Sequence, residues 1–363
     1  MSVSCGIVGL PNVGKSTIFN ALTAAQAEQG NYPFCTIEPN VAVVEVPDPN
    51  LQRINDRIET EKVIPAACQV TDIAGLIKGA SQGEGMGNKF LSNIRECDAI
   101  MQVVRCFEGS TVVRDDPVDP IGDIEVIELE LVLADLETVN KAIDRNQKRL
   151  RSLDKEAVKD QEAYEKAKAV LEDGKLLRTA DWNDREKLAL KPLCLMTSKK
   201  MLYVANVADD DMLGEGELAQ RVAKHATESG AEWIAFCGDL ESELRKMDDD
   251  ERAEFMAELG VEQLGLGALI AAVYKVLGLQ TYYTAGEKEI RAWTVPAGAL
   301  APQAAGVIHT DFEKGFIRAE IYTVEDLDAH KSEAAIRAAG KLRTEGRSYE
   351  MQEGDVCHFL IGR

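Results

Sequence analysis

The chain has 363 residues, 45% of them hydrophobic and 28% charged, a composition typical of a folded protein with two or three domains. No apolar run approaches the roughly 18 residues of a membrane-spanning helix, and the net charge of −21 argues against a general RNA-coating protein. We expect no signal peptide, because the first apolar run stops at Pro11 without a basic segment before it, and therefore a cytoplasmic protein by default. Neither a membrane nor DNA is an expected partner.

The first predicted element is a phosphate loop. Residues 9–17 read GLPNVGKST, which fits the pattern G-x-x-x-x-G-K-[ST], and they lie between a short apolar strand and an apolar helix. Gly9 and Gly14 let the backbone curl so that its N–H groups point at phosphate oxygens. Lys15 adds a positive charge for the β and γ phosphates, and Ser16 offers a hydroxyl to Mg²⁺. The predicted nucleotide-binding residues of this loop are Asn12, Val13, Gly14, Lys15, Ser16 and Thr17.

Two later motifs are expected to complete the Mg²⁺ and γ-phosphate site. Thr36 lies in a proline-punctuated loop, where P-loop switch proteins place a second Mg²⁺ ligand; the alternative is a turn threonine with a local hydrogen bond. An apolar strand ends in a D-x-x-G motif, in which Asp72 can hold Mg²⁺ through water and the N–H of Gly75 can meet the γ-phosphate. The predicted metal ligands are therefore Ser16, Thr36 and Asp72. Leu76 follows where Ras-type hydrolases carry the glutamine that orients water, so another group positions the water or hydrolysis is slow.

Three stretches together resemble a known family. GLPNVGKST, YPFCTIEPN and DIAGLIKGASQGEGMGNKF are similar to the Obg-related P-loop NTPases and, among them, to the YchF subfamily of Obg-like ATPases. The resemblance runs along the whole chain, because the C-terminal segment is similar to the TGS domain of that family. It implies an α/β fold with a nucleotide-binding domain, an inserted helical hairpin and a β-grasp domain, expected at residues 1–124 with 200–279, at 125–199 and at 280–363.

The hairpin is also predicted from the sequence itself. Apolar side chains occupy the a and d positions of one heptad register, which Asn146 interrupts. They are Leu136, Val139, Ile143, Leu150, Leu153 and Ala157. Residues 141–159 hold seven basic side chains against three acidic ones, so any contact with RNA phosphates is expected there first. The alternative for these basic residues is a solvated helix face.

The base-recognition segment departs from the guanine pattern. Asn206, Val207, Ala208 and Asp209 lie where guanine-specific proteins carry N-K-x-D, whose aspartate accepts two hydrogen bonds that adenine does not offer. The YchF resemblance implies ATP, although that family usually has glutamate at the position of Asp209. Asn206 can pair with adenine N6 and N7, and Val207 offers an apolar seat, so ATP is favoured and a guanine-specific switch is the alternative.

The resemblance also places a catalytic histidine of the family at Arg114 in this chain. An arginine cannot act as a base near pH 7, but it can neutralise charge on a transferring phosphoryl group. The alternative is a surface arginine paired with Asp115 or Asp116. The sequence therefore predicts a Mg²⁺-dependent ATPase with Lys15, Gly75 and Arg114 as catalytic residues and with ATP, or alternatively GTP, as substrate. The expected partner is the ribosome, its large subunit or RNA, and a ribosome-binding module with weak turnover is the second interpretation.

The last domain is predicted to be a small mixed β-sheet module. Strands are expected at residues 282–286, 290–295, 316–322 and 354–361, with a short helix near 332–339. This size and mixture of elements fit the β-grasp domain that the resemblance implies.

Overall fold

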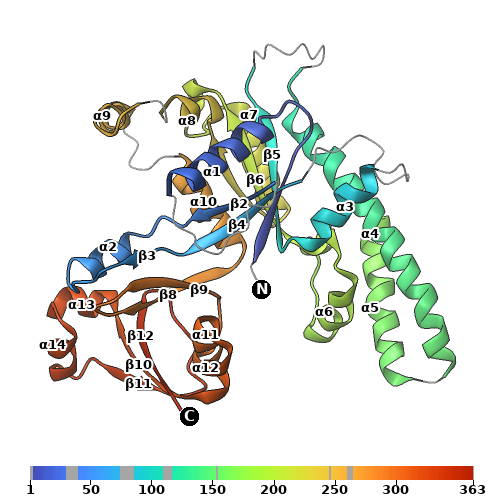
Figure 1. Cartoon of the computed structure of the whole chain (residues 1–363). Coiled ribbons are helices and arrows are strands. Elements are labelled where there is room, and N and C mark those ends of the chain that lie inside the picture. Colours follow the sequence, from blue (N-terminus) through green and yellow to red (C-terminus); the bar gives the residue numbers. More distant parts are fainter. Residues whose placement is uncertain are drawn as a thin grey trace. The chain divides into compact units, whose positions relative to one another are not determined.

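The computed structural model describes residues 3–29, 40–73, 86–108, 117–152, 154–244, 247–259 and 265–362 (Figure 1). The chain forms two compact units. Unit 1 comprises Met1–Ala42 and Gln69–Val276, and unit 2 comprises Val43–Cys68 and Leu277–Arg363. Among the described helices, none has both the length and the apolar character needed to cross a membrane.

Unit 1 is built on a six-stranded sheet. The strand order is β2 (Val41–Glu45), β4 (Ala67–Asp72), β1 (Ser4–Val8), β5 (Ala99–Cys106), β6 (Lys200–Val207) and β7 (Glu232–Phe236). Strands β4, β1, β5, β6 and β7 are parallel. Parallel strands are covered on both faces, which explains why β5 and β6 are apolar runs rather than alternating ones.

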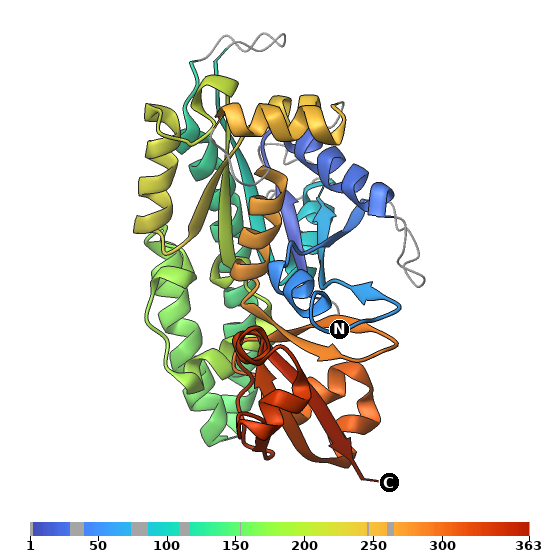
Figure 2. The ribbon, with the colours of Figure 1, turned by 90° about the vertical axis from the view of Figure 1, so that its left-hand side faces the viewer.

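Helices cover both faces of this sheet. Their bounds are α1 (Lys15–Gln29), α3 (Met86–Glu96), α4 (Pro120–Arg151), α5 (Lys155–Glu172), α6 (Asp184–Leu190), α7 (Glu217–Glu228), α8 (Gly238–Leu244), α9 (Asp249–Leu259) and α10 (Gly265–Val276). Side chains of α3, α4 and α7 share one buried cluster with those of β1, β5 and β6. Helices α1 and α10 lie across the sheet from them (Figure 2). The result is the three-layer α/β arrangement that the phosphate loop requires.

The predicted helical hairpin is present as α4 and α5. Its seam contains Val139, Ala167 and Leu171, with Leu136 and Ile143 packed against them, so the heptad pattern predicts these positions of α4 correctly. Leu150 is only half-buried, and Leu153 lies outside the described residues. Asn146, which interrupts that pattern, is buried and donates from its Nδ2 to the carbonyl of Ala157 at 2.8 Å and to Oε1 of Gln161 at 3.1 Å. The interruption is therefore an interhelical hydrogen bond, a device that fixes the register of paired helices.

A buried aspartate joins the hairpin to the sheet. Asp135 of α4 is fully buried and accepts hydrogen bonds from the backbone N–H of Met196 at 3.0 Å and from the backbone N–H and hydroxyl of Thr197, both at 2.7 Å. Burial raises the pKa of Asp135, and the bonds from Thr197 and Met196 oppose that rise. Because Met196 begins the turn that leads into β6, this carboxylate holds the start of that strand.

Asp135→Ala is expected to lower the free energy of unfolding by about 3 kcal/mol or more, because three buried donors lose their acceptor. Glu137→Ala, on the exposed side of the same helix, removes only an i,i+4 ion pair with Lys141 and is expected to cost less than about 0.5 kcal/mol. Urea denaturation followed by circular dichroism measures both. Similar losses for the two variants would contradict the structural role of Asp135.

Unit 2 is built on a second six-stranded sheet. The order is β11 (Arg343–Glu345), β10 (Phe316–Thr323), β12 (Asp355–Ile361), β8 (Leu279–Ala285), β9 (Ile290–Pro296) and β3 (Val63–Ile64). The helices are α2 (Pro49–Asn55), α11 (Ala301–Ile308), α12 (Thr310–Gly315), α13 (Val324–His330) and α14 (Glu333–Ala338). Alanines of α11 pack on Tyr282, Phe316 and Ile321 of the sheet. The strands predicted for the last domain are all present.

An N-terminal segment completes this second unit. The sequence analysis placed residues 43–68 in the nucleotide-binding domain, whereas in the structure the part of this segment from Asp48 to Ile64 has its partners in the C-terminal part of the chain. Val63 pairs with Ile290 in the sheet, and Arg53 forms an ion pair with Asp328 at 2.8 Å. The hydroxyl of Tyr283 donates to Asp48 at 2.8 Å. Unit 2 is therefore assembled from two stretches that lie far apart in the sequence.

Candidate functional site

The phosphate loop joins β1 to α1 in a tightly curled conformation. Asn12 and Gly14 both have left-handed backbone, with φ of 64° and 92°, and Val13 between them does not. Backbone that alternates in hand in this way forms a concave, anion-binding nest. A Cβ added at Gly9 would lie 2.8 Å from Cγ2 of Val13, so this position needs glycine. The loop has the geometry predicted from its sequence.

Asn206 of β6 binds the backbone of the phosphate loop. It lies near the end of β6, is only 5% exposed, and donates from its Nδ2 to the carbonyl of Val13 at 3.0 Å. Its Oδ1 accepts from the N–H of Gly238, in the turn after β7, at 3.3 Å. A Cβ on Gly14 would lie 2.1 Å from this Nδ2, so Asn206 packs directly on the loop. These contacts use one of the two donors and one of the two lone pairs of the amide.

Val207 and Asp209 differ in their surroundings. The side chain of Val207 is 3% exposed and belongs to the apolar cluster against which Leu10 of the phosphate loop packs. Met212 and Leu240 pack on the same cluster. Asp209 is exposed and begins a short 3-10 helix after β6. Val207 is therefore part of the buried core of unit 1, whereas the carboxylate of Asp209 lies at the surface.

Lys15 and Asp72 meet at the mouth of the loop. Lys15 is the first residue of α1 and Asp72 the last of β4, and their side chains form an ion pair that is largely shielded from solvent. Ser16 follows at the start of α1 with an exposed side chain, and Cγ2 of Thr17 faces Gly238. Residues from two distant motifs are therefore brought together as the spacing predicted.

This donor set fits a magnesium ion. Mg²⁺ is usually held by one or two carboxylates or hydroxyls, with water and nucleotide phosphates filling the other positions. Asp72 supplies a carboxylate and the neighbour of Lys15, Ser16, an exposed hydroxyl, whereas no group of three or more His, Cys, Asp or Glu side chains that could hold a metal ion is found among the described residues. The site suits a metal that arrives with a nucleotide.

Three predicted site residues cannot be placed. Thr36, Gly75 and Arg114 lie outside the residues that the structure describes, as does Leu76. Their assigned roles as metal ligand, γ-phosphate donor and phosphoryl-charge stabiliser stay predictions.

A buried network of polar side chains that includes Tyr203 of β6 was not predicted. The Nη2 of Arg178 donates to Oε1 of Glu128 at 2.9 Å and to the hydroxyl of Tyr203 at 2.8 Å. Burial alone would raise the pKa of Glu128, but hydrogen bonds from His225 and Tyr203 and the charge of Arg178 lower it overall. The network braces β6 three residues before Asn206. The one signal in the sequence is a tyrosine within an otherwise apolar strand.

Comparisons with known proteins identify the family of this chain. The family model for the 50S ribosome-binding GTPase matches residues 4–165, and the model YchF-GTPase_C, described as "Protein of unknown function (DUF933)", matches residues 279–362. The Ribosome-binding ATPase YchF of Escherichia coli O157:H7 is 50% identical over 362 residues, 99% of each chain. The chain belongs to the YchF family.

Other YchF proteins support the same assignment. The Ribosome-binding ATPase YchF of Bacillus subtilis (strain 168) is 49% identical over 99% of both chains. The solved structure of the Schizosaccharomyces pombe YchF GTPase is similar with a TM-score of 0.89 at 38% identity, over 99% of this chain and 98% of that one. The YchF resemblance and the α/β fold class predicted from the sequence are therefore confirmed.

Gly14→Ala is expected to weaken nucleotide binding about 100-fold, because the new methyl group would displace Asn206 and strain the left-handed backbone. Gly174→Ala is the matched control, since that glycine also has positive φ but no atom within 4 Å of its added Cβ. Titration with a fluorescent ATP analogue measures both dissociation constants. Wild-type affinity in Gly14→Ala would show that the contact with Asn206 does not hold the loop.

Proposed function

We propose that this YchF protein is a Mg²⁺-dependent ATPase that hydrolyses ATP to ADP and phosphate and acts in association with the ribosome. The observation that carries the proposal is the curled phosphate loop, with Lys15 and Asp72 at its mouth and Asn206 bound to its backbone. The names of the bacterial relatives and of the matching 50S ribosome-binding family support the ribosomal partner and, with it, a cytoplasmic location.

Different residues of the chain bind the phosphates, hold the metal and contact the γ-phosphate. The backbone of residues 12–17 binds the phosphates, and Lys15 exchanges its contact with Asp72 for the β- and γ-phosphate oxygens. Ser16, Thr36 and Asp72 would hold Mg²⁺, which when bound neutralises charge on the same phosphates. The N–H of Gly75 contacts the γ-phosphate. Because Leu76 cannot orient water, intrinsic turnover is slow and sensitive to partners.

Adenine is the base that the described residues favour. The apolar Val207 side chain and the remaining donor and lone pair of Asn206 suit adenine, and Asp209 lies exposed beyond them. Asp209 is also the observation that favours the second candidate, a guanine-specific switch, because its carboxylate can accept from guanine N1–H and N2–H₂. The nucleotide preference separates the two.

Titration with labelled nucleotides is expected to give ATP a lower dissociation constant than GTP. Asp209→Asn is expected to leave the ATP affinity within about threefold, because adenine offers no donor pair to this carboxylate. A lower dissociation constant for GTP, lost in Asp209→Asn, would establish the guanine switch instead.

Lys15→Ala should abolish hydrolysis. Hydrolysis that ribosomes do not stimulate, with ribosome association unchanged in Lys15→Ala, would favour a binding module over an enzyme.

Arg114 is proposed to stabilise charge on the transferring phosphoryl group. Arg114→Ala is then expected to slow single-turnover hydrolysis about 10³-fold while ATP affinity changes little. Arg221→Ala is the control, because Arg221 is a partly exposed surface arginine paired with Asp119 at 2.8 Å. A single-turnover rate in Arg114→Ala equal to that of the control would show that Arg114 is likewise a surface residue.

A further inference from the structure

The seven basic side chains of residues 141–159 fall into two sets. Lys141, Arg149 and Lys159 form ion pairs within the hairpin, with Glu137, with Asp154 and Asp160, and with Glu156. The other four, Arg145, Lys148, Arg151 and Lys155, are exposed and form no ion pair with any described residue. We call these four the open basic set.

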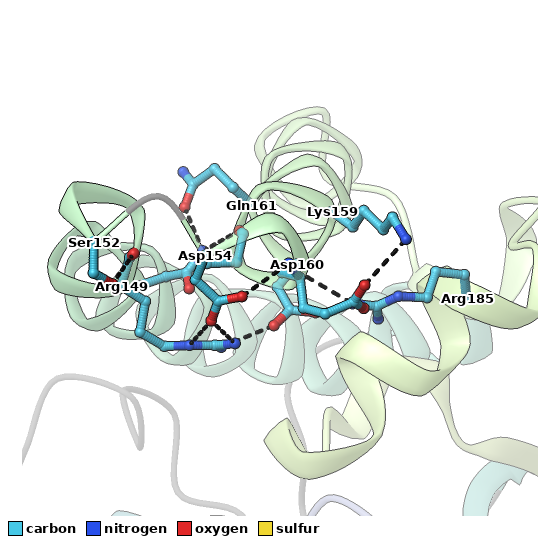
Figure 3. A network of polar contacts seen from close by, with 10 residues as sticks. Arg149, Ser152, Asp154, Lys159, Asp160, Gln161 and Arg185 are labelled. Atoms are coloured by element: carbon cyan, nitrogen blue, oxygen red, sulfur yellow. Dashed lines mark hydrogen bonds and ion pairs between the residues drawn. The ribbon is translucent and has the colours of Figure 1, made fainter.

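The acidic side chains near the end of the hairpin are already matched. Figure 3 shows Asp160 of α5 between Arg149 of α4 and Arg185 of α6, at 2.9 and 2.6 Å. Arg185 also reaches Glu156 at 2.9 Å. Four basic side chains, Lys141, Arg149, Lys159 and Arg185, therefore meet four carboxylates, those of Glu137, Asp154, Glu156 and Asp160. The positive charge left over comes from the open basic set, with Asp144 as the remaining acid of the segment.

The open basic set lies along one surface. Arg145, Lys148 and Arg151 recur every three residues, so they rise by about 4.5 Å from one to the next on the last turns of α4. At 3.6 residues per turn, Lys148 lies opposite the buried Val139, and Arg145 and Arg151 lie on either side of Lys148. Lys155 follows in the first turn of α5, at the same end of the hairpin. This end projects from the sheet of unit 1 (Figure 1).

Helix stability accounts for only part of this set. Lys148 and Arg151 are in the last turn of α4, where positive charge complements the helix dipole. Arg145 lies more than a turn from that end. Lys155 lies in the first turn of α5, where the dipole disfavours a cation. The helix dipole therefore does not favour two of the four positive charges, those of Arg145 and Lys155, in a chain whose net charge is −21.

We propose that the open basic set contacts ribosomal RNA phosphates, an inference that rests on the proposed ribosome association. The set consists of long, exposed and uncompensated cations without an aromatic side chain among them, which suits contact with phosphate rather than stacking on bases. The contact is therefore independent of base sequence and weakens with salt. An acidic ribosomal protein is the other polyanion that this surface could meet, and protein-free RNA separates the two.

The test compares two double variants with one substitution on each helix. Arg145→Gln with Lys155→Gln removes two members of the open basic set, and Lys141→Gln with Lys159→Gln removes two paired lysines at the same cost in net charge. Binding to ribosomes is measured by co-sedimentation, and binding to protein-free ribosomal RNA by fluorescence anisotropy at several salt concentrations. The first double is expected to raise both dissociation constants at least about tenfold and to lower the salt slope by about 1.5, whereas the second changes neither much.

The outcomes separate this inference from the proposed function. Absence of ribosome binding by the wild-type protein overturns the ribosome association itself. Ribosome binding that both doubles retain equally overturns only the role of the open basic set. Wild-type protein that binds ribosomes but not protein-free RNA, with loss in the first double, overturns RNA as the partner in favour of a ribosomal protein. ATP hydrolysis without ribosomes, expected to be equal in all three proteins, shows that unit 1 stays folded.

Discussion

One side-chain amide, that of Asn206, joins the phosphate loop to the start of α8. Asn206 bonds the carbonyl of Val13, 193 residues earlier, and the N–H of Gly238, 32 residues later. The first of these groups belongs to the phosphate loop and the second to the first residue of α8. Because both partners are backbone atoms, the end of β6 ties the phosphate loop to the start of α8 whatever side chains those two residues carry.

Strand β6 is accordingly held along its whole length. Asp135 of α4 fixes the turn that precedes it, and the network of Glu128 and Arg178 holds Tyr203 in its middle. Two of these anchors lie on the first half of α4, the helix whose far end carries the open basic set. The strand that positions Asn206 is therefore hydrogen-bonded to the same helix that carries most of the open basic set.

Features encoded within a short stretch were predicted well. The glycines and Lys15 of the phosphate loop specify its conformation locally, and the heptad pattern of α4 correctly predicts its buried face. Apart from the meeting of Lys15 with Asp72, contacts between distant residues were not predicted. Asn206 gives no sign in the sequence that it binds Val13, and the ion pair of Arg53 with Asp328 joins residues 275 apart through side chains that are ordinary for a surface. Periodicity and motif spacing report on neighbours along the chain, whereas these contacts depend on the folded topology.

The composition of unit 2 limits how this chain can be divided. The chain passes between unit 1 and unit 2 three times, after Ala42, after Cys68 and after Val276. A fragment beginning at residue 277 would lack the edge strand β3, and the hydroxyl of Tyr283 would lose the carboxylate of Asp48. The C-terminal segment is thus not a module that recombination or truncation can move by a single cut.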